Sequence, residues 1–212
     1  MMFKFMKLWS LFVLLAFSAT SAISQENDPV SVVKTSIDKV MLSIDVNRDS
    51  FDQNPDVLTN EMIVILDPVV AFDSIASGVM GRYRKDASDE QIEKFAKTFK
   101  KTMVKLYAKA LISFESKSIE VLEPSAEDIS PKKAKIVSHV TAENGTVYKV
   151  IYSMRKSKEG VWQARNMIVD GINLGLTYVN QFDSAMNRYG GDIDLVINSW
   201  QSDLDQSDVG GR

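Results

Sequence analysis

Few residues in this 212-residue sequence have the types and spacing that catalysis or metal binding requires. Cys is absent and His139 is the single histidine, which excludes thiol catalysis, Cys-ligated zinc, disulfides and a multi-histidine metal site. The sequence contains no G-x-S-x-G or H-E-x-x-H motif and no Gly-rich phosphate loop. Asp73, Asp170 and His139 are the acid and base candidates, and they would have to meet in a buried site to act as a pair.

One segment resembles the first half of a calcium-binding loop. Asp45, Asn47 and Asp49 take its first, third and fifth positions, and Asp56 stands twelfth. The sixth position is Ser50, where the tight turn of such a loop needs Gly. We therefore expect no metal site here.

The composition indicates one folded domain rather than a nucleic-acid-binding or disordered chain. Hydrophobic residues make up 45% of the sequence, and 25 Lys and Arg stand against 28 Asp and Glu. The resulting charge of -3 lacks the basic excess that binding along a nucleic acid needs. A chain of this length and polarity is expected to bury one core.

The N-terminus has the pattern of a secretory signal peptide. Lys4 and Lys7 precede an apolar run over residues 8–17, and small residues follow. The run is about half of the ~20 residues that span a bilayer, so a permanent membrane anchor is the weaker alternative. We expect cleavage after Ser24, with Ala22 as second choice, one domain over residues 25–205 and a flexible tail over 206–212.

Apolar spacing predicts helices, then strands, then helices. Helical periodicity covers residues 29–45, 54–66, 68–81 and 88–114, and Ser88 with Gln91 forms a capping box before the last of these. Strands are predicted over 118–122, 135–142, 146–156 and 161–169, with a turn at Asn144-Gly145. Helices over 174–189 and 193–204 close the chain. This order indicates an α+β fold in which an antiparallel sheet of about four strands is wrapped by amphipathic helices.

The sequence also contains many large, adaptable apolar residues. Phe or Met occurs in every predicted helix except the last, and one face of the strand over 146–156 carries Tyr148, Val150, Tyr152 and Met154. An ordinary core explains such residues, but they also suit a cavity between sheet and helices that binds a variable apolar ligand.

Two blocks of sequence, Ile65–Leu111 and Gly160–Trp200, carry a resemblance to a known family. Their landmarks are Asp73 before Gly81-Arg82, then Tyr107, Trp162 and Trp200. In order and spacing these blocks resemble the MlaC family, also called the toluene-tolerance family, of periplasmic phospholipid carriers. The sequence departs from the usual family pattern at Asn166, Asn173 and Val179.

The resemblance implies a fold similar to the nuclear-transport-factor-like cone, with an internal lipid cavity. It implies a monomeric periplasmic carrier that is not an enzyme and has no metal or cofactor, with a diacyl phospholipid as cargo. Its partners would be the MCE subunit of an inner-membrane ABC transporter and an outer-membrane lipoprotein–porin complex, and its role would be to maintain outer-membrane lipid asymmetry. The alternatives are a cone-shaped isomerase or dehydratase acting on a small apolar substrate, and a structural or adhesive module.

The phospholipid-carrier hypothesis leads to two sets of candidate site residues. The lipid-binding set consists of apolar residues on the predicted helices and strands: Phe72, Ile75, Phe95, Phe99, Met103, Tyr107, Val150, Tyr152, Met154, Trp162, Met167, Ile172, Leu176 and Phe182. The partner-docking set is basic and is expected near the cavity mouth: Arg82, Arg84 and Lys85, together with the lysine face of the helix over 88–114.

Overall fold

The chain folds as helices, then strands, then helices, which confirms the α+β prediction. The computed structural model describes residues 28–114 and 116–209, so the predicted signal peptide lies outside the described residues. The elements are α1 (Pro29–Asn47), α2 (Pro55–Leu66), α3 (Phe72–Val79), α4 (Asp89–Ser113), β1 (Ser116–Val121), β2 (Lys133–Ala142), β3 (Val147–Lys156), β4 (Trp162–Val169), β5 (Ile172–Asn173), α5 (Leu174–Arg188) and α6 (Ile193–Val209), with short 3₁₀ helices at Arg48–Ser50 and Gly81–Lys85.

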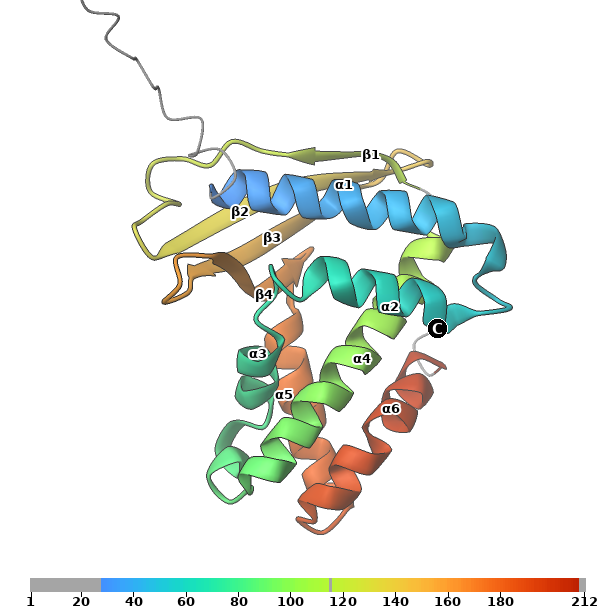
Figure 1. The fold of residues 1–212 in the computed structure, drawn as a ribbon, viewed down its shortest axis with the longest axis vertical. Coiled ribbons are helices and arrows are strands. Elements are labelled where there is room, and N and C mark those ends of the chain that lie inside the picture. Colours follow the sequence, from blue (N-terminus) through green and yellow to red (C-terminus); the bar gives the residue numbers. More distant parts are fainter. Residues whose placement is uncertain (1–27, 115, 210–212) are drawn as a thin grey trace, which may run out of the picture.

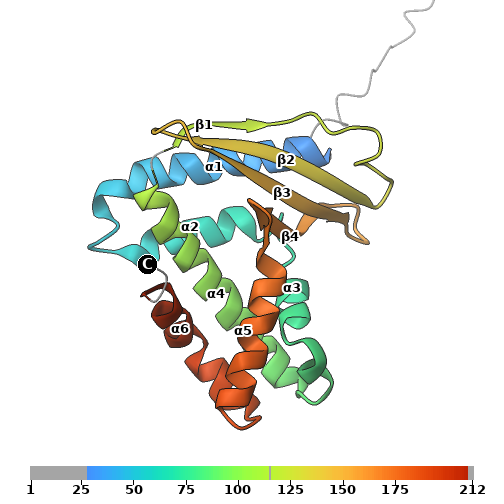
Figure 2. The same cartoon turned by 180° about the vertical axis from the view of Figure 1, so that it is seen from behind.

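The strands form one open antiparallel sheet in the order β1-β2-β3-β4-β5. The fifth strand has two residues and was not predicted. Helix α1 lies along one face of the sheet, whereas α3, α4, α5 and α6 extend away from it as a bundle (Figure 1). From behind, no helix covers β2 and β3, so the opposite face of the sheet is open (Figure 2). We call the covered face the inner face and the other the outer face.

Capping side chains explain where α1 and α4 begin. The Asp28 carboxylate accepts a hydrogen bond from the Ser31 backbone N–H at 2.9 Å and caps α1. Before α4, the Ser88 hydroxyl accepts from the Gln91 N–H at 3.2 Å, and the Gln91 side chain accepts from the Ser88 N–H at 3.0 Å. These two bonds confirm the predicted capping box.

The third helix begins at Phe72, four residues after the predicted start at Pro68. The intervening backbone pairs with β4: the Ala164 N–H donates to the Val69 carbonyl at 2.8 Å, and the Ala71 N–H donates to the Ala164 carbonyl at 3.0 Å. Tertiary pairing thus keeps this segment extended despite its helix-start signal.

The structure also shows the backbone of the calcium-loop candidate and the end of the last helix. The calcium-loop candidate begins in the last turn of α1, continues through the 3₁₀ helix and ends with Asp56 in α2, and the Asn47 side chain donates to the Ser43 carbonyl and to Glu61. A helical backbone cannot wrap an ion in the way that loop does. Helix α6 continues to Val209, beyond the predicted end at Leu204, while residues 210–212 lie outside the described part of the chain.

Most buried hydrophobic residues of the described part of the chain form three separate clusters. The first lies within the bundle of α3, α4, α5 and α6 and contains Phe95, Phe182 and Trp200. The second joins α1, α2, α3 and α4, and the third joins α1 to the inner face of the sheet. Because the clusters do not merge into one continuous core, a space remains where they meet.

Candidate functional site

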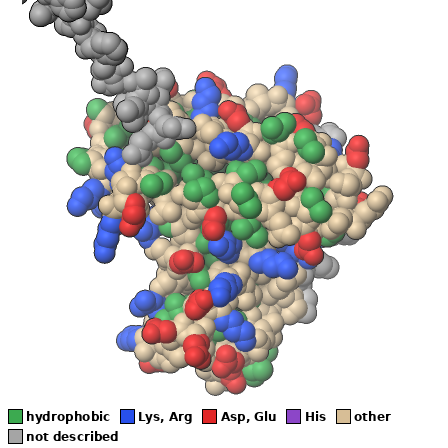
Figure 3. Space-filling model, in the orientation of Figure 1, with side chains coloured by type: hydrophobic (Ala, Val, Ile, Leu, Met, Phe, Trp, Pro, Cys, Tyr) green, Lys and Arg blue, Asp and Glu red, His purple; other side chains and the backbone are tan. Residues whose placement is uncertain are grey.

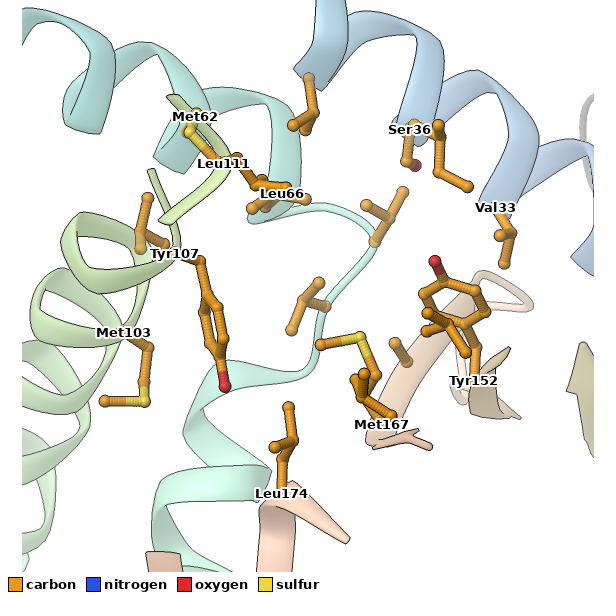
Figure 4. A pocket seen from close by; sticks show the side chains of 18 of the residues that line it. Val33, Ser36, Met62, Leu66, Met103, Tyr107, Leu111, Tyr152, Met167 and Leu174 are labelled. Carbon is orange, nitrogen blue, oxygen red and sulfur yellow. The ribbon is translucent and has the colours of Figure 1, made fainter. Parts of the chain in front are cut away.

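A cavity of about 550 Å³ occupies the space between the three clusters. Pockets for small molecules have volumes of about 300–1,000 Å³. Met103 and Tyr107 of α4 face Tyr152 and Met167 of the strands across this space, and Val33 of α1 closes another side (Figure 4). Nearly every helix and strand contributes to the walls: Val32, Val33, Ser36, Ile37, Val40, Met41, Met62, Leu66, Val69, Val70, Phe72, Ile75, Phe99, Met103, Val104, Tyr107, Ala110, Leu111, Phe114, Ser116, Ile119, Val140, Tyr148, Val150, Tyr152, Met154, Ala164, Asn166, Met167, Val169, Leu174, Gly175 and Tyr178.

Strand β3 supplies one wall through simple alternation. Tyr148, Val150, Tyr152 and Met154 all line the cavity, because side chains two residues apart point to the same face of a strand. The intervening residues point to the outer face. The sequence pattern predicted this shared face correctly.

Strand β4 supplies a second wall through an irregularity. The register with β3 shifts between Ser153 and Met154: Ser153 pairs with Asn166 and Met154 pairs with Ala164, so Arg165 is the extra residue. Such a bulge re-aims side chains. As a result, Asn166 and Met167 both border the cavity although they are neighbours in the chain.

The bulge also positions a polar group beside the N-terminus of α5. The Asn166 amide accepts a hydrogen bond from the Gly175 N–H at 3.0 Å and donates to the Asn173 side chain at 2.9 Å. Asn173 in turn caps α5 by accepting from the Leu176 N–H at 3.1 Å. A Cβ atom at Gly175 would lie 2.7 Å from the Asn166 oxygen, so this close approach requires glycine.

Among the described residues, the lining carries hydroxyl and amide groups but no charged side chain. The Tyr152 hydroxyl lies 3.3 Å from that of buried Ser138, and burial raises the pKa of Tyr152 above its usual value of 10.0. Apolar walls with a few fixed polar groups suit a ligand that is mostly hydrocarbon.

The structure places nine of the predicted lipid-binding residues on the cavity wall. They come from α3, α4, β3 and β4: Phe72, Ile75, Phe99, Met103, Tyr107, Val150, Tyr152, Met154 and Met167.

The other five predicted residues lie elsewhere, so the expectation that they line the cavity was wrong. Phe95 and Phe182 pack together in the first cluster with ring centroids 4.9 Å apart. Trp162 is buried in the third cluster, under the Lys156 ammonium. Ile172 and Leu176 are 61% and 57% exposed, because β5 and the first turn of α5 turn these side chains to solvent.

The contribution of α1 to the cavity was not predicted. Val33, Ile37, Val40 and Met41 form its apolar stripe, and all four border the cavity. The periodicity that revealed the helix was the available signal, but it does not distinguish a stripe facing a cavity from one facing a core.

The acid and base candidates do not meet in the cavity. Asp73 and Asp170 are exposed, and His139 lies in β2 opposite Lys149 on the outer face. The Asp170 carboxylate accepts a hydrogen bond from the Lys149 backbone N–H at 2.8 Å. None of the three borders the cavity.

The predicted docking residues Arg82, Arg84 and Lys85 lie in the 3₁₀ helix after α3, at the end of the bundle away from the sheet (Figure 1). The expectation that they border the cavity mouth was therefore wrong. Arg82 forms an ion pair with Asp183 and a hydrogen bond of 2.9 Å with the Tyr83 hydroxyl. These contacts raise the pKa of Arg82, the Tyr83 bond most of all.

The surface over α1 and α2 is partly apolar. Hydrophobic side chains lie across the middle of this face (Figure 3). Leu42 and Val46 of α1 and Val64 of α2 are 66%, 73% and 76% exposed. Within the described residues, no helix combines the length and apolar character needed to cross a bilayer.

Comparison with known proteins agrees with this architecture. The family model described as "MlaC protein" matches residues 34–202. The chain belongs to the MlaC family. Toluene tolerance protein ttg2D of Pseudomonas putida is 32% identical over 195 residues, which cover 92% of this chain and 88% of the relative.

Two further relatives of this MlaC-family chain are informative. The intermembrane phospholipid transport system binding protein MlaC of Haemophilus influenzae is 29% identical over 197 residues, covering 92% of this chain and 91% of the relative. A Ralstonia solanacearum phospholipid-binding protein, solved in complex with a phospholipid, has the same fold. Its TM-score is 0.71 at 24% identity, over 84% of this chain and 98% of the other.

Proposed function

We propose that this protein binds a diacyl phospholipid with its acyl chains in the cavity and carries it through the periplasm. The observation that supports the proposal most directly is the mainly apolar lining drawn from the helices and the inner face of the sheet, in which no described residue is charged. The names of the relatives in Haemophilus and Ralstonia, which mention phospholipid, agree with it.

The hydrophobic effect explains why such cargo needs an enclosed carrier. Two acyl chains contain on the order of 30 methylenes, and at ~0.8 kcal/mol each their exposure to water would cost roughly 25 kcal/mol. The hydrophobic effect that drives burial of the methylenes is non-directional and does not depend on charge. The cavity is therefore expected to require acyl chains and to tolerate different headgroups.

Family membership supports a place between the two membranes. In this proposal, cleavage of the signal peptide releases the protein into the periplasm as a monomer. It exchanges lipid with the MCE subunit of an inner-membrane ABC transporter and with an outer-membrane lipoprotein–porin complex, which maintains lipid asymmetry. We propose no catalytic role, since Asp73, Asp170 and His139 do not converge on the cavity.

Lipid analysis of purified protein tests the proposal. Protein expressed in a Gram-negative periplasm should contain about one diacyl phospholipid per chain after denaturing extraction and mass spectrometry, with headgroups that mirror the host membrane. Protein that is purified without lipid and takes up none from liposomes would contradict it.

A further inference from the structure

The outer face of the sheet has a second concave site, separate from the cavity. A cleft of about 380 Å³ lies between strands β2 to β4 and the segment before β2, and we call it the outer-face cleft. Its charged residues are Lys133, Lys135, Arg155, Arg165, Glu127 and Asp128. Four cations against two carboxylates leave the cleft positive, although the protein as a whole is acidic.

The register of the sheet brings two of these cations together. Lys133 and Arg155 are direct cross-strand partners, and both point outward because their neighbours Ala134 and Met154 are buried on the inner face. Like charges placed directly opposite destabilise a strand pair. Among the described residues no carboxylate forms an ion pair with Lys133 or Arg155, whereas Lys135 is paired with Asp128 at 2.7 Å.

Arg165 adds a third cation and an unsatisfied donor. It is the extra residue of the bulge in β4, and one guanidinium nitrogen donates to the Ser74 hydroxyl. Its Nε is buried and finds no acceptor among the described residues. Buried donors in folded proteins are nearly always paired, so this atom indicates a missing acceptor.

We propose that the outer-face cleft binds a phosphate group. Two guanidinium groups and an ammonium group offer the charge-assisted donors that phosphate oxygens accept, and guanidinium can do so in bidentate fashion. A bound phosphate would also relieve the repulsion between Lys133 and Arg155. The phosphate can come from a phospholipid headgroup on a membrane surface or from inorganic phosphate, and the two sources are separable by experiment.

The test compares two variants with the same loss of charge. The cleft variant is Lys133→Gln with Arg155→Gln, and the control is Lys34→Gln with Lys39→Gln on the exposed side of α1. One arm measures co-sedimentation with phosphatidylglycerol vesicles, and the other titrates inorganic phosphate by calorimetry. The cleft variant is expected to bind about 30-fold more weakly in the arm that binds wild-type protein, while the control stays within about threefold.

If the wild type binds in one of the two assays and the cleft variant binds more weakly there, the site is supported. The assay in which this happens identifies the source of the phosphate group. Absence of wild-type binding in both arms, or equal binding by all three proteins, overturns the proposal. The thermal midpoint of the cleft variant should stay level or rise by up to about 4 °C, because the like-charge pair is gone. Its cavity lipid content should match that of the wild type, which separates this site from the cavity.

Discussion

The hydroxyl groups of Tyr107 on α4 and Tyr178 on α5 lie 2.7 Å apart, although 71 positions separate the two residues in the sequence. Both side chains border the cavity, and the ring of Tyr178 meets that of Phe99 edge-on at 5.7 Å. The hydroxyl contact therefore joins two helices at the boundary between the cavity and the packed bundle below it.

Replacement of Tyr107 by Phe should remove this bond without changing the shape of the cavity. We expect the free energy of unfolding to fall by about 1 kcal/mol and the thermal midpoint by about 2–4 °C. Lipid content should stay unchanged, because methylene contacts supply the binding energy. Tyr148→Phe is the control: its hydroxyl forms no hydrogen bond with a described residue, so an equal loss of stability there would contradict the role of the pair.

Replacement of Val150 by Asp should empty the cavity. Val150 is 7% exposed and lines the cavity. An unpaired buried carboxylate at this position costs several kcal/mol. We expect the lipid content measured by extraction and mass spectrometry to fall at least tenfold. Circular dichroism must first show that the variant is folded.

Leu176→Asp serves as the matched control for Val150→Asp. Leu176 is 57% exposed, so the new carboxylate stays in water and lipid content should match the wild type. If both Asp variants retained lipid, the cavity would not be the lipid site.

Replacement of Gly175 by Ala should disturb the junction of β4 and α5. The new Cβ would lie 2.7 Å from the Asn166 oxygen, and overpacking of this kind costs about 1–3 kcal/mol. Chemical denaturation should show the loss, and it should shrink in an Asn166→Ala background, where the colliding oxygen is gone. Gly78→Ala in α3 meets no atom within 4 Å and should be neutral or stabilising.

The partly buried Tyr152 should make the protein sensitive to alkaline pH. Because burial raises its pKa above 10.0 in the folded state, the unfolded state releases this proton first. The contribution of Tyr152 to stability is therefore complete below about pH 10 and is lost as pH rises toward the folded pKa. Urea unfolding between pH 8 and 11 should show a shallower decline for Tyr152→Phe than for the wild type; parallel curves would contradict this assignment.

Sequence periodicity predicted which side of each element faces inward, but not whether that side meets the packed core or the cavity. Phe95 and Phe99 are one helical turn apart on the same stripe of α4. Phe95 packs against Phe182 and Trp200, whereas Phe99 reaches the cavity wall. An apolar stripe that continues from a packed bundle into a cavity has no change of residue type where the cavity begins. The sequence therefore could not show the position of that boundary.

The remaining differences arise from tertiary contacts. The bulge that allows both Asn166 and Met167 to line the cavity depends on the register between β3 and β4. Alternation of residue types alone does not encode that register. The late start of α3 depends on backbone pairing with Ala164. Strand β3 was predicted well because alternation over ten residues needs no information from other elements.

The separation of the three buried clusters has a consequence for the response to hydrostatic pressure. Unfolding under pressure is favoured in proportion to the internal void volume that it eliminates. A protein whose clusters enclose about 550 Å³ should therefore unfold at lower pressure without cargo than with it, since acyl chains fill that volume. The same occupied volume should make the loaded form less compressible, and ultrasonic velocity can measure that difference.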